Sequence, residues 1–131
     1  MQKMKISGTE FIAGRWPLDP SLPSLIFIHG AAGSKMFWKE QVQGLADCCN
    51  SIAVDLPGHG DHSGSGFDSV DGYADAVEMF IESAGIDLPV VCGLSMGGAI
   101  VQKLLLDGKL EYNAGIIVNS GARLKVMPAI F

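Results

Sequence analysis

The sequence lacks the features that mark membrane proteins and nucleic-acid-binding proteins. No apolar run approaches the roughly 20 residues that a membrane-spanning helix needs, although apolar residues make up 48% of the chain. There is no run rich in Lys and Arg, and the formal net charge is −5, which disfavours a nucleic-acid partner. We therefore expect no membrane span and no nucleic-acid surface. The apolar excess instead predicts a sheet covered on both faces, or a surface that meets another molecule.

Cysteine is scarce as well, because the chain has only Cys48, Cys49 and Cys92. Three cysteines do not make a disulfide framework, and the basic residues near the N-terminus precede no apolar leader segment. We therefore expect a reducing, cytoplasmic location. Cys48 and Cys49 are predicted on a helix, and Cys92 is predicted as a small apolar residue in a core strand. The scattered His and Cys residues lack the spacing of metal ligands, so we expect no metal and no cofactor.

Strand patterns and helix patterns alternate along the chain. Continuous apolar runs predict buried strands, and apolar residues at helical spacing predict amphipathic helices. The expected strands are 24–28, 51–55, 88–92 and 114–119, after an N-terminal hairpin within 3–16, and the expected helices are 37–49, 70–81 and one ending near 107–108. This alternation predicts an α/β fold: a doubly wound, mainly parallel sheet with helices on both faces. The 131 residues suffice for a single domain, 1–131, with a core.

The most informative stretch is Gly-Leu-Ser-Met-Gly at 93–97, between an apolar strand and a helical pattern. A turn this sharp places the serine in a strained backbone conformation, and side chains two residues before and after it would collide. Glycine is therefore needed at Gly93 and Gly97. The turn would project the Ser95 hydroxyl above the sheet at the start of a helix, where the backbone N–H of Met96 can face a developing oxyanion.

Other interpretations of this stretch are a glycine-rich turn with a solvated serine, or a nucleotide-binding turn. The strand before it and the helix after it favour a nucleophile over a solvated serine. The nucleotide-binding alternative ranks lower, because Gly93, Gly97 and Gly98 do not form Gly-x-Gly-x-x-Gly and the chain has no phosphate-loop lysine motif.

Three segments together resemble the N-terminal half of an α/β-hydrolase, in the esterase, lactonase and C–C-bond hydrolase branch. They are His-Gly-Ala-Ala-Gly-Ser at 29–34, Asp-Leu-Pro-Gly-His-Gly at 55–60 and Gly-Leu-Ser-Met-Gly-Gly at 93–98. The resemblance extends from about Leu25 to Asn119. It implies a serine hydrolase that acts on a small-molecule ester, thioester or lactone by acyl transfer.

The resemblance also implies roles for particular residues. Ser95 would be the nucleophile, and the backbone N–H groups of Met96 and Ala31 would form the oxyanion hole. Gly30 and Ala32, beside Ala31, would contact the substrate, while 55–60 would be a structural loop. One wall of the pocket is a possible place for Phe37, Trp38 and Met96, although such residues are often core residues.

The histidines do not fit the catalytic order of that family. His29, His59 and His62 all precede Ser95, whereas α/β-hydrolases place the acid and then the histidine after the serine. After Ser95 there is no histidine, and the only carboxylates are Asp107 and Glu111. We therefore expect a partial domain that lacks the lid, the later strands and two triad members, and that is inactive by itself.

A partial domain would leave the last strand, 114–119, open along its outer edge, with Ile116, Ile117 and Val118 exposed. An open, flat strand edge invites pairing with another chain. We therefore expect the isolated chain to form homo-oligomers. The alternative function is a non-catalytic scaffold that uses this edge as its working surface.

Overall fold

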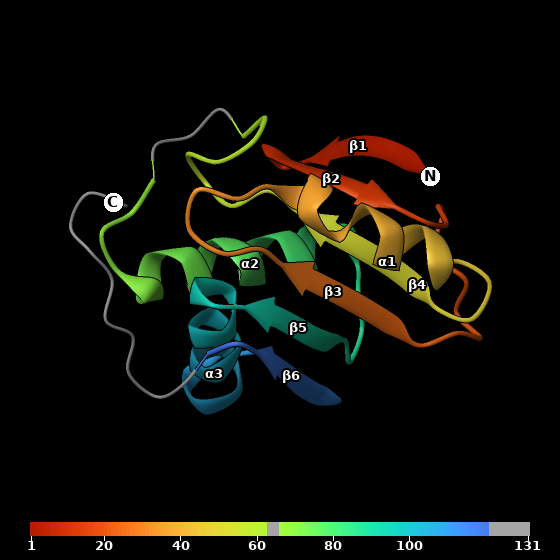
Figure 1. The fold of residues 1–131 in the computed structure, drawn as a ribbon. Coiled ribbons are helices and arrows are strands. Elements are labelled where there is room, and N and C mark those ends of the chain that lie inside the picture. The colour runs from red at the N-terminus through yellow and green to blue at the C-terminus, as the bar shows by residue number, and fades with distance from the viewer. Residues whose placement is uncertain (63–65, 121–131) are drawn as a thin grey trace.

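The computed structural model describes residues 1–62 and 66–120, and these form a mixed sheet of six strands in the order β1-β2-β4-β3-β5-β6 (Figure 1). The strands are β1 (Gln2–Ile6), β2 (Thr9–Ala13), β3 (Ser24–Ile28), β4 (Asn50–Val54), β5 (Val90–Leu94) and β6 (Ala114–Val118). The helical elements are η1 (Lys35–Trp38), α1 (Lys39–Gly44), α2 (Val70–Ala84) and α3 (Met96–Asp107).

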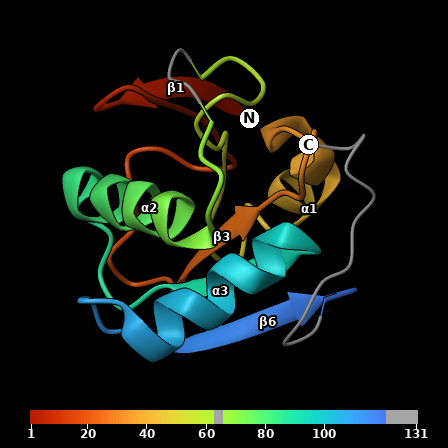
Figure 2. The same ribbon diagram turned by 90° about the vertical axis from the view of Figure 1, so that its left-hand side faces the viewer.

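Strands β4, β3, β5 and β6, in this order across the sheet, pair in parallel. Strands β1 and β2 form the predicted antiparallel hairpin at one edge, and β2 pairs antiparallel with β4. Helix α1 covers one face of the sheet, and α2 and α3 cover the other (Figure 2). The predicted doubly wound, mainly parallel sheet is therefore confirmed. Its central strands β3, β4 and β5 are mostly buried, and apart from Ser24, Asn50 and Ser51 at the strand starts they consist of apolar residues and glycine, as suits strands covered on both faces.

Two predicted element boundaries were wrong for local reasons. The strand predicted at 88–92 begins only at Val90, because Leu88 has a φ of 44° and Pro89 follows it. The helix predicted at 37–49 consists of η1 and a short α1 that ends at Gly44. Glycine propagates a helix poorly, and Cys48 and Cys49 lie in the turn after it, not on a helix. Cys92 is buried in β5 as predicted.

Strand β6 forms the other edge of the sheet. Among the described residues it pairs only with β5, and Ile116 and Ile117 remain 45% and 44% exposed, as predicted, whereas Val118 is half-buried. The contribution of residues 121–131 to this edge lies outside the described residues. No helix in the described ranges is both long enough and apolar enough to span a bilayer.

Candidate active site

The turn between β5 and α3 has the strained geometry that its sequence predicts. Ser95 has φ 55° and ψ −114°, outside the regions that most residues adopt. A Cβ atom on Gly93 would overlap the backbone of Gly97, and a Cβ atom on Gly97 would overlap the carbonyl oxygens of Ile28 and His29. Both glycines are therefore required by close backbone contacts, and they fix Ser95 at the carboxyl end of the sheet.

The backbone around Ser95 leaves helical amides available. The Ser95 N–H donates to the carbonyl of Val118 at 3.0 Å, and the Ser95 carbonyl accepts from Gly98 and Ala99. Met96 is the first residue of α3, so its amide has no carbonyl one turn earlier in the helix. An amide in this position can donate to an oxygen above the serine.

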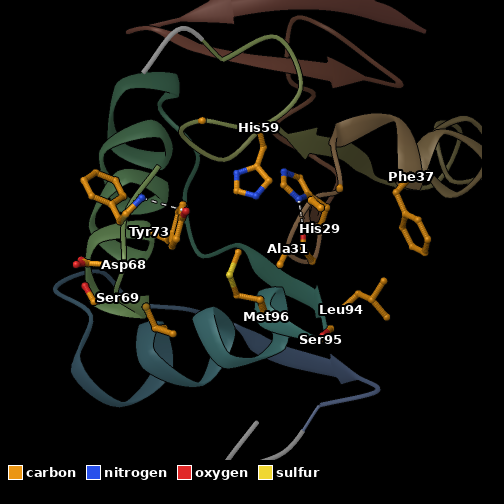
Figure 3. Close-up of a pocket in the computed structure, with 16 residues that line it drawn as sticks. His29, Ala31, Phe37, His59, Asp68, Ser69, Tyr73, Leu94, Ser95 and Met96 are labelled. Carbon is orange, nitrogen blue, oxygen red and sulfur yellow. Dashed lines mark hydrogen bonds between the residues drawn. The ribbon is translucent and has the colours of Figure 1, made fainter. Parts of the chain in front are cut away.

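Ser95 opens into a cavity of about 920 Å³ between the loop after β3 and the start of α2 (Figure 3). Backbone-rich segments and apolar side chains make up most of its wall. The lining residues are His29, Gly30, Ala31, Ala32, Gly33, Phe37, Gly58, His59, Phe67, Asp68, Ser69, Val70, Tyr73, Leu94, Ser95 and Met96. The structure thus brings every predicted site residue to one cavity.

Of the three residues considered for the cavity wall, Phe37, Trp38 and Met96, two line the cavity and one does not. Phe37 and Met96 line the cavity. Trp38 does not, because it stacks on Phe27 with ring centroids 4.7 Å apart and is only 6% exposed in the α1-side core. Adjacent residues of η1 therefore face opposite environments, which the sequence did not distinguish.

His29 is completely buried, and both of its ring nitrogens are engaged. Its Nε2 accepts a hydrogen bond from the Leu56 N–H at 3.1 Å, and its Nδ1 lies 2.7 Å from the Gly30 carbonyl oxygen. Because the Leu56 amide can only donate, the His29 proton must sit on Nδ1 and be donated to Gly30. Burial lowers the pKa of His29 and so favours this neutral form. These hydrogen bonds make His29 a structural residue of the loop.

His59 is half-buried on the cavity wall, with its ring 5.1 Å from that of His29 and 5.9 Å from that of Tyr73 (Figure 3). Its Nδ1 lies 3.0 Å from the Pro57 carbonyl oxygen. Tyr73 in turn accepts a hydrogen bond from the Phe67 N–H at 3.0 Å. This contact holds the segment before α2 against the cavity, where the Ser69 side chain caps the helix by accepting a hydrogen bond from the Gly72 N–H. His62 is not a lining residue.

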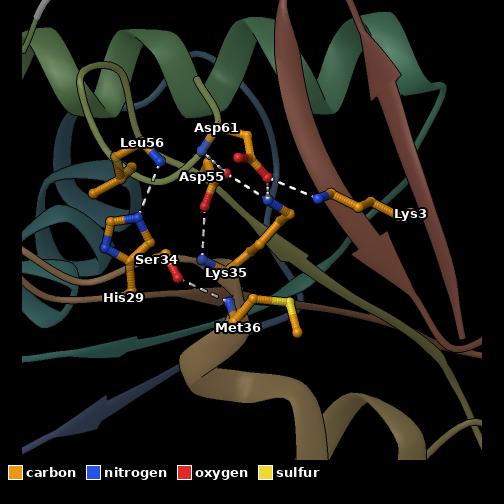
Figure 4. Close-up of polar contacts among 8 residues, drawn as sticks. All are labelled: Lys3, His29, Ser34, Lys35, Met36, Asp55, Leu56 and Asp61. Carbon is orange, nitrogen blue, oxygen red and sulfur yellow. Dashed lines mark hydrogen bonds and ion pairs between the residues drawn. The ribbon is translucent and has the colours of Figure 1, made fainter. Parts of the chain in front are cut away.

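A buried ion pair between the segments after β3 and β4 was not predicted from the sequence. Lys35 is 1% exposed, and its Nζ lies 2.7 Å from Asp55 Oδ2 and 2.8 Å from Asp61 Oδ2 (Figure 4). Asp61 also pairs with Lys3 of β1 at 2.9 Å. Burial by itself would lower the pKa of Lys35, but its hydrogen bonds to both carboxylates outweigh that effect and raise it. Hydrogen bonds from Lys35 and Lys3 lower the pKa of Asp61 to about 2.

Within residues 1–62 and 66–120, no three His, Cys, Asp or Glu side chains come together in a way that could hold a metal ion.

Comparison with known proteins gives a consistent family assignment. A family model described as the alpha/beta hydrolase family matches residues 25–131. The chain is 35% identical over 105 residues to the 2-succinyl-6-hydroxy-2,4-cyclohexadiene-1-carboxylate synthase of Escherichia coli O157:H7 (strain EC4115 / EHEC), a match that covers 78% of this chain and 40% of that protein. The chain thus spans about 40% of the length of the curated relatives that it matches.

Solved structures agree with the family model. A thermophilic esterase superimposes with a TM-score of 0.76 at 29% identity, over 97% of this chain and 47% of the other. A lipase-esterase related protein from Clostridium acetobutylicum ATCC 824 gives a TM-score of 0.77 at 28% identity, over 93% of this chain and 51% of the other.

Proposed function

The chain belongs to the alpha/beta hydrolase family, and from this premise we propose that Ser95 is the nucleophile of an acyl-transfer site for esters, thioesters or lactones. The observation that carries this proposal is the backbone of Ser95, held at φ 55° between two glycines that tolerate no side chain. Strain of this kind persists where surrounding structure enforces it, and it is concentrated at functional sites. A serine that only closed a turn would have no need of it.

In the proposed reaction, Ser95 Oγ attacks the substrate carbonyl carbon, and the carbonyl oxygen takes up the negative charge. The backbone N–H groups of Met96 and Ala31 would donate to that oxyanion. The hydroxyl proton passes to a general base and then to the departing alcohol, thiol or ring oxygen, which leaves an acyl group on Ser95. Gly30 and Ala32 would contact the substrate. A Cβ on Gly30 would lie 3.4 Å from that of Ser95, so glycine keeps this approach open.

The general base is the missing component of this proposal. His29 already uses both ring nitrogens, and the sequence contains no histidine after Ser95. We propose that this chain by itself lacks the histidine and the acid of the triad. The serine then remains protonated at neutral pH, so acylation is slow and turnover is negligible.

The cavity wall supports an uncharged substrate with an apolar acyl group. Phe37, Phe67, Val70 and Leu94 contribute apolar surface, and none of the lining residues identified in the described ranges is Lys or Arg. A second candidate is a synthase reaction like that of the E. coli relative, favoured by 35% identity to it. That relative is named for a carboxylate, and a carboxylate in this cavity would face no positive side chain from the described residues, so we favour the ester.

A test that supplies the missing base separates these steps. The 131-residue chain is mixed with p-nitrophenyl butyrate, with and without added imidazole, and the covalent butyryl adduct is measured by intact mass. We expect slow, stoichiometric acylation that imidazole accelerates, no adduct on Ser95→Ala, and a normal rate for the control Ser21→Ala. Ordinary steady-state turnover without imidazole that depends on Ser95 would contradict the missing base. Equal acylation of Ser95→Ala would contradict the nucleophile.

The alternative of a self-associating scaffold is favoured by one observation, the exposed edge of β6 with Ile116 and Ile117. We propose homo-oligomers of the isolated chain through this edge, in addition to the acyl-transfer site. The scaffold alternative predicts that Ser95→Ala is neutral for folding and for binding. The three free cysteines, of which Cys48 is exposed, suit the proposed cytoplasmic location.

A further inference from the structure

The loop that carries Ala31 has little internal support. Within residues 30–34 a single backbone hydrogen bond, from the Gly33 N–H to the Gly30 carbonyl at 3.1 Å, closes the turn. Ala32 sits in the left-handed region with a φ of 60°, where a residue with a side chain is disfavoured. Such a loop keeps one conformation only if contacts from elsewhere in the fold hold it.

Two adjacent residues after β4 hold the two ends of this loop. At its start, the Leu56 N–H donates to His29 Nε2, and the same imidazole donates to the Gly30 carbonyl. At its end, the Lys35 N–H donates to Asp55 Oδ1 at 2.7 Å. Asp55 and Leu56 therefore fix both flanks of the segment that contains Ala31 (Figure 4).

Asp55 binds Lys35 twice. One carboxylate oxygen accepts the backbone N–H and the other accepts Nζ, both at 2.7 Å, and the second oxygen also accepts the Asp61 N–H at 2.8 Å. The Asp55 side chain is completely buried. A Cβ on Gly60 would overlap its carboxylate, and Gly60 has a φ of 54°. The loop after β4 thus encloses the carboxylate and leaves it little freedom to rotate away from Lys35.

The ammonium group of Lys35 balances this buried charge, which would otherwise be costly. Lys35 also links Asp55 to the edge hairpin, because Asp61 pairs both with Lys35 and with Lys3 of β1. The ion pair and the backbone hydrogen bond therefore have different roles. The Lys35 ammonium neutralises the Asp55 carboxylate, whereas Asp55 Oδ1 accepts the Lys35 N–H and so holds the loop.

We propose that Asp55 is a positioning residue of the oxyanion hole, acting through its hydrogen bond to the Lys35 backbone, and that Lys35 neutralises Asp55 so that this bond can be buried. The inference rests on the proposed function, in which the Ala31 N–H stabilises the oxyanion on the substrate of Ser95. Loss of the Asp55 acceptor would let 30–35 shift and move the Ala31 amide from its place opposite Met96.

The test compares two double variants that both remove the buried charges. Asp55→Asn with Lys35→Met keeps a side-chain oxygen for the residue-35 N–H, whereas Asp55→Leu with Lys35→Met has nearly the same shape and no acceptor. Each folded protein is treated with an alkyl fluorophosphonate and imidazole, so that Ser95 Oγ bonds to phosphorus, fluoride leaves and imidazole takes the proton. The maximal labelling rate and the half-saturating concentration are measured separately, and thermal midpoints establish that both variants fold.

Removing one oxyanion donor costs about 100- to 1000-fold in rate, so displacing one should cost about 10- to 100-fold. For the Leu variant we expect the maximal labelling rate to fall by this factor, with the half-saturating concentration unchanged. For the Asn variant we expect the maximal labelling rate to fall by no more than about threefold. Lys103→Met, which removes a surface ion pair with Asp71 and Asp107, should label like the wild type. Equal labelling rates for the two double variants would overturn the proposal.

A second readout keeps the result independent of the nucleophile. If wild-type Ser95 is not labelled, the proposed function fails, and amide hydrogen exchange then decides the positioning role. The residue-35 amide should exchange slowly in the wild type and the Asn variant and fast in the Leu variant, with a shifted Ala31 amide resonance in the last. Equal exchange in both variants would overturn the proposal.

Discussion

The two parallel strands that end at the cavity, β3 and β5, differ sharply from β6 at the edge of the same sheet. In the segments that follow β3 and β5, close backbone contacts and buried hydrogen bonds hold the chain in place. Ser95 is strained between two obligatory glycines, and the loop at 30–34 is held at both ends. In β6, by contrast, all residues but Val118 are exposed. The geometry around Ser95 is set by contacts within this chain, whereas the exposed residues of β6 have no comparable constraint among the described residues.

The elbow and the β6 edge therefore differ in how strictly the structure constrains the residue at each position. The elbow has no room for a Cβ atom at Gly93 or Gly97, and the loop opposite it is held by hydrogen bonds from Asp55 and Leu56, so single atoms matter there. At the β6 edge the described residues instead present exposed apolar surface, and the association proposed there would depend on apolar area and strand pairing, which many partners could satisfy. Variants at the two places should therefore differ in both the size and the kind of their effects.

The largest expected effect is at the elbow. Gly93→Ala places a Cβ against the Gly97 backbone, which cannot move without displacing α3, so we expect a loss of about 4 kcal/mol or more of unfolding free energy, or no folded protein. Gly44→Ala is the matched control, because a Cβ there meets nothing within 4 Å. It should be neutral or stabilise by about 0.5–1 kcal/mol. Urea unfolding of both variants measures the difference, and similar destabilisation of the two would contradict the steric account.

A smaller effect is expected where the segment before β6 is tied to α2. Glu78 accepts hydrogen bonds from the Lys109 and Leu110 amides and, at 2.7 Å, from the Tyr112 hydroxyl. Tyr112→Phe removes a bond to a charged group and should cost about 1.5–3 kcal/mol, whereas Tyr73→Phe removes a bond to a neutral amide and should cost about 0.5–1.5 kcal/mol. Chemical denaturation compares them. A larger loss for Tyr73→Phe would reverse the expected order.

The ion pairs of Asp61 with Lys35 and Lys3 should make the stability of the protein depend on pH, which nothing described at the β6 edge would do. Folding lowers the pKa of Asp61 to about 2, from a reference value of 3.8, through its bonds to Lys35 and Lys3. The stabilisation is therefore fully present above the unfolded value and is lost as the pH falls from about 4 toward 2. Asp61→Asn should flatten this decline in denaturation midpoints measured between pH 5 and pH 2. Parallel curves for the variant and the wild type would show that the pair contributes nothing.

The smallest effect on the folded monomer is expected at the edge. Ile116 is 45% exposed on β6, so Ile116→Lys should change the unfolding free energy by no more than about 0.5 kcal/mol. The same substitution places like charges against each other in a pair of edges and should shift the protein toward monomer in sedimentation velocity. A wild-type chain that stays monomeric over a wide concentration range would contradict the proposed association.

The sequence was most informative where the constraint is local. Continuous apolar runs predicted the buried strands, because such runs suit strands covered on both faces. The spacing of Gly93, Ser95 and Gly97 predicted the elbow. The collision that Gly93 avoids is local, with the Gly97 backbone, whereas Gly97 avoids the carbonyls of Ile28 and His29, which are distant in the sequence.

The sequence was least informative where the constraint comes from distant residues. Lys35 precedes Met, Phe and Trp and looks like any surface lysine, and its burial depends on Asp55, twenty positions later in the chain. Phe37 and Trp38 are equally apolar, yet one lines the cavity and the other enters the core. Only the packing of η1 against the sheet decides between them.

The most direct test of the central claim is to identify the site that a fluorophosphonate modifies in the wild-type chain. Intact mass followed by peptide mapping should find a single adduct on Ser95, formed faster with imidazole and absent from Ser95→Ala. A folded wild-type chain without an adduct on Ser95, or with the same adduct pattern in Ser95→Ala, would contradict the assignment of Ser95 as the nucleophile.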